Sequence, residues 1–188
     1  MSSSTRDAKA PASSNSASSH LSSMDASPPA GIKAAVLTVS DSCARGKRAD
    51  VSGPAVAEVL KRLHFQVVVR TVAPDERDAI QEKLIELCGF ARLVVTTGGT
   101  GIAPRDVTPE ATSAVCDRLV EGIAERMRLQ GSQKTRFAAL SRAVCGVRGT
   151  TLILNLPGSP AGAVESLQAV MDLLPHALEL IAGKTEHE

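Results

Sequence analysis

Aromatic residues are scarce in this 188-residue sequence, which contains no tryptophan, no tyrosine and only Phe65, Phe90 and Phe137. Proteins that bind single-stranded nucleic acid by stacking need several aromatic side chains. The formal net charge of +1 provides no strong positive field for nucleic acid or for an anionic membrane. No apolar run approaches the roughly 20 residues that a spanning helix needs. We therefore predict neither a nucleic-acid nor a membrane partner.

Paired cysteine motifs are missing as well. Cys43, Cys88, Cys116 and Cys145 lie far apart, with no CxxC pair and no histidine at metal-binding spacing. Such thiols usually act as small buried apolar groups in a reducing compartment. The pattern predicts free thiols and a cytoplasmic protein.

The first residues differ in composition from the rest of the chain. Residues 1–31 are rich in Ser, Ala and Pro and contain few large apolar side chains. Such a segment cannot bury enough surface to offset the entropy of ordering it, so we predict a disordered tail. An organelle transit peptide is the alternative, although the acids Asp7 and Asp25 are atypical of one. Residues 32–185 are sufficient for one domain.

Strand-like and helix-like patterns alternate from Ile32 onward. The apolar patterns predict strands over 34–39, 65–72, 92–97, 143–147 and 150–155, and helices over 54–63, 76–88, from 108, over 121–131 and from 160 to about 181. This alternation predicts an α/β fold with helices on both faces of a mostly parallel sheet. The two late strands can form a hairpin, which would make the sheet mixed.

Capping and breaking residues mark several of these boundaries. Ser52, Thr108 and Ser159 each precede a helical pattern and are predicted N-caps. Residues 42–52 between the first strand and helix read as a polar loop. Pro175 should kink or split the last helical region.

Polar and small residues follow four of the predicted strands. They are Ser40 and Asp41, Asp75, the stretch from Gly98 to Asp106, and Asn155 with Pro157, Gly158 and Ser159. In an open parallel sheet, ligands bind at the carboxyl ends of the strands. We therefore expect these segments to meet at one rim.

The stretch TTGGTGIAPRD, residues 96–106, contains neither a GxxxxGK[ST] P-loop nor a GxGxxG fingerprint. Its glycines permit backbone N–H groups to face an anion together, but they are equally consistent with a tight turn. Asp75 also has two possible roles, as a helix cap or as a site residue. The carboxylate of Asp106 can form an ion pair with Arg105 or Arg136 instead of binding a ligand. Three carboxylates, Asp41, Asp75 and Asp106, beside a phosphate cradle would suit Mg²⁺ and phosphoryl or nucleotidyl transfer.

Other chemistries have less support. No GxSxG elbow is present. His64, His176 and His187 lie away from the predicted rim, and His20 lies in the tail, so a histidine catalyst is not expected.

Several motifs in order resemble one family. LVVTTGGTGIAPRDVTPEAT, with VLTVSDS before it, APDE between them and ALSRAVCGVRGTTLILNLPGSP after it, is similar to the molybdopterin-binding Mog/MoaB-like proteins, above all to their molybdopterin adenylyltransferase branch. The resemblance spans about residues 32–183. It implies a three-layer α/β/α fold and a homotrimer, with a hexamer in some branches.

The resemblance also implies a reaction and a site. Molybdopterin is adenylylated by ATP with Mg²⁺, giving adenylyl-molybdopterin and pyrophosphate for a separate molybdate-insertion protein. Asp75 and Asp106 match the essential carboxylates and the expected metal ligands. Matching nucleotide or molybdopterin contacts are Ser40, Asp41, Gly98, Gly99, Thr100, Gly101, Ser141, Arg142, Pro157, Gly158 and Ser159. A non-catalytic molybdopterin- or nucleotide-binding carrier of the same family is the alternative function, and a scaffold is a weaker one.

Overall fold

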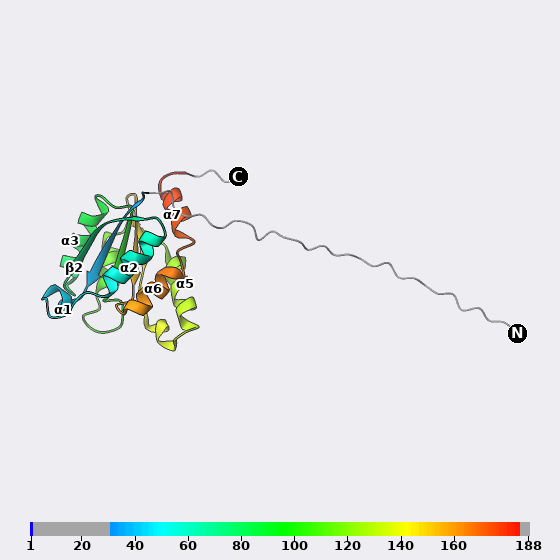
Figure 1. Ribbon diagram of the computed structural model, residues 1–188, viewed down its shortest axis with the longest axis horizontal. Coiled ribbons are helices and arrows are strands. Elements are labelled where there is room, and N and C mark those ends of the chain that lie inside the picture. Colours follow the sequence, from blue (N-terminus) through cyan, green and yellow to red (C-terminus); the bar gives the residue numbers. More distant parts are fainter. Residues whose placement is uncertain (2–30, 185–188) are drawn as a thin grey trace.

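The structure is a computed structural model that describes Met1 and residues 31–184. The predicted tail therefore lies, apart from Met1 and Gly31, outside the described residues. Figure 1 shows helices on both sides of a central sheet. The elements are β1 (Lys33–Val39), α1 (Asp41–Ala44), α2 (Ser52–Arg62), β2 (Gln66–Ala73), α3 (Arg77–Cys88), β3 (Leu93–Thr97), α4 (Thr108–Val115), β4 (Arg118–Leu119), α5 (Glu121–Ser132), the 3₁₀ helix η1 (Arg136–Leu140), β5 (Cys145–Arg148), β6 (Thr151–Leu156), α6 (Pro160–Gln168) and α7 (Leu174–Ile181).

The sheet has six strands in the order β2-β1-β3-β6-β5-β4. β1 pairs in parallel with both β2 and β3, and β3 pairs in parallel with β6. β5 runs antiparallel to β6 and to β4. The link between β5 and β6 is too short for a crossover, so these strands form a hairpin, with Gly149 at φ 54° in its turn. The predicted mostly parallel, mixed sheet is confirmed.

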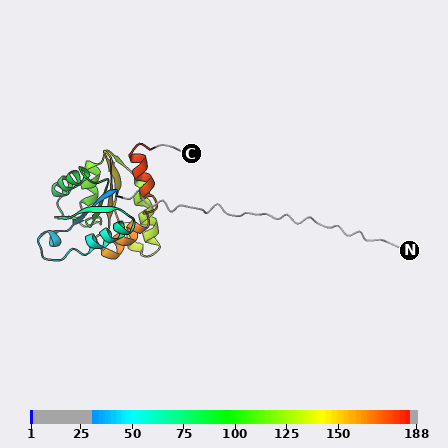
Figure 2. The same ribbon diagram turned by 45° about the horizontal axis from the view of Figure 1, so that its top comes forward.

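Each face of the sheet has its own hydrophobic core. On one face, Val56 and Leu60 of α2 lie in a buried cluster with residues of α5, α6 and α7. On the opposite face, Ile80 and Leu84 of α3 and Ala111 of α4 form the second cluster. Figures 1 and 2 show α3 on one side of the sheet and α2, α5 and α6 on the other. The three-layer expectation is therefore confirmed.

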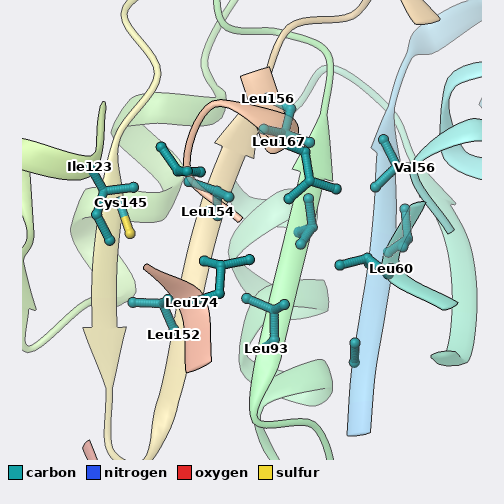
Figure 3. Close-up of a cluster of buried hydrophobic side chains, with 14 of the residues drawn as sticks. Val56, Leu60, Leu93, Ile123, Cys145, Leu152, Leu154, Leu156, Leu167 and Leu174 are labelled. Carbon is teal, nitrogen blue, oxygen red and sulfur yellow. The ribbon is translucent and has the colours of Figure 1, made fainter. Parts of the chain in front are cut away.

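The alternation of side chains along β6 explains how one strand supports two cores. Leu152, Leu154 and Leu156 belong to the larger cluster, and Figure 3 shows them along this strand. Ile153 belongs to the cluster on the opposite face. All four are fully buried, as expected for a central strand covered by helices on both faces.

Two of the three predicted helix caps are wrong. Ser52 lies inside α2, and its hydroxyl donates to the Gly158 carbonyl at 2.7 Å. Thr108 lies inside α4, and its hydroxyl donates to the Gly98 carbonyl at 2.9 Å. Both side chains bind a glycine loop instead of capping their own helix, a choice that the local pattern does not reveal. The Ser159 cap is confirmed, since its hydroxyl accepts from the Gly162 N–H at 3.2 Å.

Other differences concern short elements. The polar loop predicted over 42–52 contains the one-turn helix α1, and neither β4 nor η1 was expected. The last helical region is split as predicted, but α6 ends at Gln168 and Pro175 lies in the first turn of α7. Proline is acceptable there because a first-turn N–H has no partner within the helix. None of the helices between residues 31 and 184 combines the length and apolar character that crossing a bilayer requires.

The strand order creates a switch point between β1 and β3. The chain leaves β1 toward β2 on one side, and later returns to add β3 on the other side. Connections from the carboxyl ends of β1 and β3 therefore diverge and leave a crevice, where ligands of open α/β sheets bind.

Asn155 does not reach this crevice, contrary to expectation. Its side chain is fully buried. Its amide nitrogen donates to the hydroxyls of Thr96 at 3.0 Å and Thr112 at 2.9 Å, and its oxygen accepts from the Val144 N–H at 3.4 Å. Asn155 thus joins β3, β6 and α4 by satisfied buried hydrogen bonds.

We predict that Asn155→Ala lowers the free energy of unfolding by about 3 kcal/mol, because it removes these bonds and leaves a cavity. Thr112→Val should cost about 1 kcal/mol alone and less in the Asn155→Ala background. Urea unfolding of the single and double variants measures both effects. Full additivity of the two substitutions would contradict this assignment of the hydrogen bonds.

Candidate functional site

Two cavities open at the carboxyl ends of the strands, one on each side of a narrow ridge. The larger cavity, of about 680 Å³, lies toward α5, η1 and α6, and the smaller, of about 590 Å³, lies toward β1 and α2. Gly99, Gly158 and Ser159 line both cavities. We call the two loop segments that separate the cavities, residues 99–101 and 158–159, the ridge. Both volumes fall within the roughly 300–1,000 Å³ of small-molecule sites.

The predicted site residues divide between these cavities. Thr100, Gly101, Asp106, Ser141 and Pro157 line the larger one. Ser40, Asp75 and Gly98 line the smaller one. Asp41 and Arg142 line neither of the two. The structure therefore brings most of the predicted residues to one rim, but it separates the two carboxylates, Asp75 and Asp106, between neighbouring cavities.

Backbone N–H groups on the ridge are available to a ligand. Among residues 31–184, no group accepts a hydrogen bond from the N–H of Gly99, Thr100 or Gly101. The same is true within this range for the N–H groups of Gly158 and Ser159. Unpaired backbone donors that converge at a loop form an anion-binding concavity. The N-terminus of α6, which begins after Ser159, adds a favourable dipole.

The glycines are required by close packing as well as by conformation. Gly98 and Gly99 have φ of 104° and 63°, values that side chains disfavour. A Cβ on Gly98 would also collide with the Val39 carbonyl oxygen of β1. A Cβ on Gly158 would lie 3.2 Å from the Cα of Gly98, so the two glycine loops touch. The loop is therefore held against β1 and against the loop after β6.

Asp75 is tied to the start of α1. Its Oδ2 accepts from the Asp41 N–H at 2.7 Å, and the Asp75 N–H donates to Asp41 Oδ1 at 3.3 Å. Its other oxygen faces the glycine loop, since a Cβ on Gly99 would lie 3.4 Å from it. α3 begins after Glu76 without a side-chain cap, so the alternative in which Asp75 caps that helix is wrong.

Asp41 is neutralised by arginines. Its Oδ2 lies 2.6 Å from the Arg105 guanidinium, and its Oδ1 lies 3.5 Å from that of Arg45. Arg105 therefore pairs with Asp41, and the predicted alternative pairing of Arg105 with Asp106 is wrong. This ion pair connects the loop after β1 to the glycine-rich loop after β3.

Asp106 closes the glycine-rich loop on itself. Its Oδ2 accepts from the Ala103 N–H at 2.8 Å. The same oxygen would lie 2.8 Å from a Cβ on Gly101, which shows how tightly the carboxylate packs against the loop. Asp106 also lines the larger cavity. Its bond to the Ala103 N–H therefore holds the carboxylate against the loop that carries the free N–H groups.

Arg142 acts on this loop as a clamp. Its Nε donates to the Gly101 carbonyl at 2.6 Å, its Nη2 donates to the Asp106 carbonyl, and its Nη1 pairs with the Glu110 carboxylate. Its backbone N–H donates to the Thr100 carbonyl at 2.9 Å. Arg142 therefore positions residues that line the larger cavity, and its predicted contact with the ligand stays a prediction.

The charge of Glu110 is preserved by this clamp. Partial burial acts to raise the pKa of its carboxyl, whereas the hydrogen bond and charge of Arg142 lower it, and the net pKa lies below the usual value. Glu110 therefore remains ionised and holds the guanidinium in place near pH 7.

A metal cage and thiol chemistry find no support among the described residues. Within residues 31–184, no group of three or more His, Cys, Asp or Glu side chains is arranged to hold a metal. Asp41 is already paired, so the predicted cluster of three carboxylates is not formed. Burial raises the pKa of the Cys88 and Cys116 thiols to about 11 and that of Cys145 to about 12, so these are not nucleophiles at neutral pH.

Several lining residues were not identified from the sequence. Arg48 and Ser52 line the smaller cavity, and Lys134 and Phe137 line the larger one. The basic stretch from Arg45 to Arg48 could have indicated an anion-binding residue at the edge of the smaller cavity. The helix η1, which carries Phe137, has no sequence pattern that predicts it.

Comparisons with known proteins agree with this geometry. Residues 35–176 match the family described as the probable molybdopterin binding domain. The chain is 42% identical over 157 residues to the molybdopterin adenylyltransferase of Helicobacter pylori strain J99, an alignment that covers 79% of this chain and 86% of that protein. The crystal structure of the molybdopterin biosynthesis enzyme MoaB from Thermus thermophilus has a TM-score of 0.76 and 53% identity, covering 81% of this chain and 98% of that chain.

A longer relative contains a similar segment. The molybdenum cofactor synthesis protein cinnamon of Drosophila melanogaster is 42% identical over 149 residues, which cover 78% of this chain. The matching segment is only 25% of the Drosophila protein.

We predict that Gly98→Ala is more destabilising than Gly46→Ala. Both glycines have positive φ, but a Cβ on Gly46 would meet nothing within 4 Å. Gly46→Ala should cost about 1–2 kcal/mol through conformation alone. Gly98→Ala should cost about 2 kcal/mol more, because its Cβ must displace the β1 backbone. Equal losses in urea unfolding would show that the contact with Val39 does not constrain the loop.

Proposed function

We propose that this chain, which belongs to the family of probable molybdopterin binding domains, adenylylates molybdopterin in molybdenum cofactor biosynthesis. Relatives named molybdopterin adenylyltransferase align with most of the chain, and 86% of the Helicobacter protein is covered. The substrates are then ATP and molybdopterin, and the products are adenylyl-molybdopterin and pyrophosphate.

The observation that carries this proposal is the shared ridge between the two cavities. A transfer reaction between two anionic substrates needs both phosphates at one point. Gly99, Gly158 and Ser159 line both cavities, and their N–H groups have no acceptor among residues 31–184. One cavity for each substrate would bring the reacting phosphates together over these donors.

The chain's part in the reaction is alignment and charge stabilisation. An oxygen of the terminal phosphate of molybdopterin forms a bond to the α-phosphorus of ATP, and the bond to the bridging oxygen of pyrophosphate breaks. Ridge N–H groups stabilise the charge that builds on the α-phosphate oxygens. The clamp of Arg142 and Glu110 keeps the ridge rigid, so little reorganisation is needed during transfer.

Asp75 and Asp106 are the residues we propose to hold Mg²⁺. Each carboxylate has one oxygen bound to a backbone N–H, which leaves the other oxygen for a ligand. Magnesium commonly takes one or two protein carboxylates together with substrate phosphates and water, so this donor set fits it without a protein cage. When bound, Mg²⁺ would neutralise phosphate charge.

The oligomeric state, the cellular location and the recipient of the product are also part of the proposed function. We propose a homotrimer, with a hexamer as the alternative, a cytoplasmic location and delivery of the product to a molybdate-insertion protein. Light scattering of the purified protein tests the oligomeric state.

The deciding experiment is incubation of the pure protein with molybdopterin, ATP and Mg²⁺, with release of pyrophosphate as the readout. Binding of both substrates without pyrophosphate release would support the non-catalytic carrier function and reject the enzyme.

We predict that Asp106→Asn lowers kcat by about a hundredfold or more, because the charge near the phosphates is lost. The asparagine oxygen can still accept from the Ala103 N–H, so the loop keeps its shape and the thermal unfolding midpoint changes little. Asp75→Asn should also lower kcat strongly.

Asp117→Asn is the matched control for these variants. Asp117 likewise accepts one backbone N–H, from Gly149 at 2.6 Å, but it lines neither cavity. Its substitution should leave kcat unchanged. Near-normal turnover by Asp106→Asn would reject the assignment of that carboxylate.

We also predict that filling each cavity impairs a different substrate. Ser166 lines only the larger cavity and Ala49 only the smaller one. Ser166→Trp and Ala49→Trp should each raise the KM for one substrate by roughly tenfold or more, and not for the same one. Steady-state kinetics with either substrate varied measures this. A rise for the same substrate in both variants would contradict the division between cavities.

A further inference from the structure

Phe137 is a large apolar side chain in an unusual position. Of the three phenylalanines, Phe65 is in the core, whereas Phe137 is 64% exposed. It lies on η1, the short helix between α5 and β5. An isolated exposed apolar residue is common, but this one also lines the larger cavity. Its ring is therefore presented to whatever that cavity binds.

The local structure holds Phe137 in place. The Thr135 hydroxyl accepts from the Phe137 N–H at 3.3 Å, and the Thr135 carbonyl accepts from the Ala138 N–H at 3.1 Å. The Arg136 guanidinium lies 5.1 Å from the centroid of the Phe137 ring. This cation–π contact places Arg136 over one face of the ring, while the residue as a whole stays exposed.

The rest of the cavity is suited to a flat polar heterocycle linked to a phosphate. Gly99, Gly101 and Asp106 line it at the ridge, where we have placed phosphate. Gln130 and Gln133, near Phe137 in the chain, also line it, and both carry side-chain amides. Amides can both donate to and accept from the edge of a nitrogen heterocycle. The flat face of the heterocycle needs an apolar surface to stack on. The chain contains no tryptophan or tyrosine that could provide this surface.

We infer that Phe137 is the stacking surface for the planar nitrogen heterocycle of one substrate, whose phosphate reaches the glycine ridge. This rests on the proposed function. Both substrates carry such a heterocycle, a purine in ATP and a pterin in molybdopterin, and the same ring face suits either. Stacking on Phe137 would fix the distance from heterocycle to phosphate and so place the reacting phosphate over the ridge.

The absence of tryptophan gives a direct test. In Phe137→Trp the new indole is the only tryptophan of the chain, so its emission reports on the cavity alone. Titration with AMP in one arm and with 6-hydroxymethylpterin in the other should give saturable quenching in one arm, which identifies the heterocycle. Phe90→Trp is the matched control, because Phe90 is also exposed, at 40%, but does not line the cavity.

Quenching in Phe137→Trp but not in Phe90→Trp supports the inference. Equal quenching of both variants, or no quenching by either compound, overturns it. Emission of Phe137→Trp that changes with protein concentration alone also overturns it, because the ring would then be covered by a second copy of the chain.

Kinetics of the 188-residue chain provide an independent measurement. Phe137→Ala should raise the KM for the stacked substrate on the order of tenfold, with a smaller effect on kcat. Phe137→Leu should recover part of the loss and Phe137→Tyr most of it. A merely structural role would instead lower the unfolding midpoint and affect both substrates alike, which would contradict stacking.

The fluorescence test of Phe137 and the pyrophosphate assay of the proposed function can fail independently of each other. If the wild-type protein releases no pyrophosphate while Phe137→Trp is still quenched, adenylyl transfer is rejected and the heterocycle site remains. If pyrophosphate is released and neither compound quenches, the stacking site is rejected and the transferase function remains.

Discussion

The contact between two glycine loops is the constraint on which the site depends. A Cβ on Gly98 would collide with the carbonyl oxygen of Val39, and a Cβ on Gly158 would press tightly against the Cα of Gly98. Because neither loop has side chains there, the ridge is narrow and consists of backbone. The same backbone segments therefore line both cavities.

A set of distant side chains maintains this contact. The hydroxyls of Thr108 and Ser52 bind the carbonyls of Gly98 and Gly158, and Thr97 donates to the Pro157 carbonyl at 2.7 Å. The loop carbonyls are bound in this way, whereas the N–H groups of Gly99, Gly158 and Ser159 have no acceptor among residues 31–184. At the end of the glycine-rich loop, the Arg142 guanidinium likewise binds a backbone carbonyl, that of Asp106. The loops are thus rigid for a physical reason, although they contain flexible glycines.

The acids of the rim have different roles despite their similar positions after strands. Asp41 is an ion-pair partner of Arg105 that joins two loops, whereas Asp75 and Asp106 each bind a backbone N–H through one oxygen and line a cavity. The difference arises from the neighbours of each carboxylate. Two arginines pair with Asp41, whereas no arginine or lysine pairs with Asp75 or Asp106 among the described residues.

The sequence by itself determined the architecture and the list of rim segments. Alternating apolar patterns set the helices and the strands, and the carboxyl ends of parallel strands must share one edge, so Asp75, Gly98 and Ser159 were expected together. Motif order also indicated the family. These features depend on local periodicity and on general rules of sheet topology, which a single sequence contains.

Only the tertiary structure decided which partner each polar group takes. Ser52 and Thr108 look like helix caps in the sequence but bind the carbonyls of two glycine loops. Asn155 looks like a rim residue but is buried, with its side chain bound to Thr96 and Thr112. Phe137 gained its place in the cavity from η1, which has no sequence signal. A hydroxyl or amide has many possible partners of similar energy, and the choice among them is made by which groups the folded chain brings within about 3 Å.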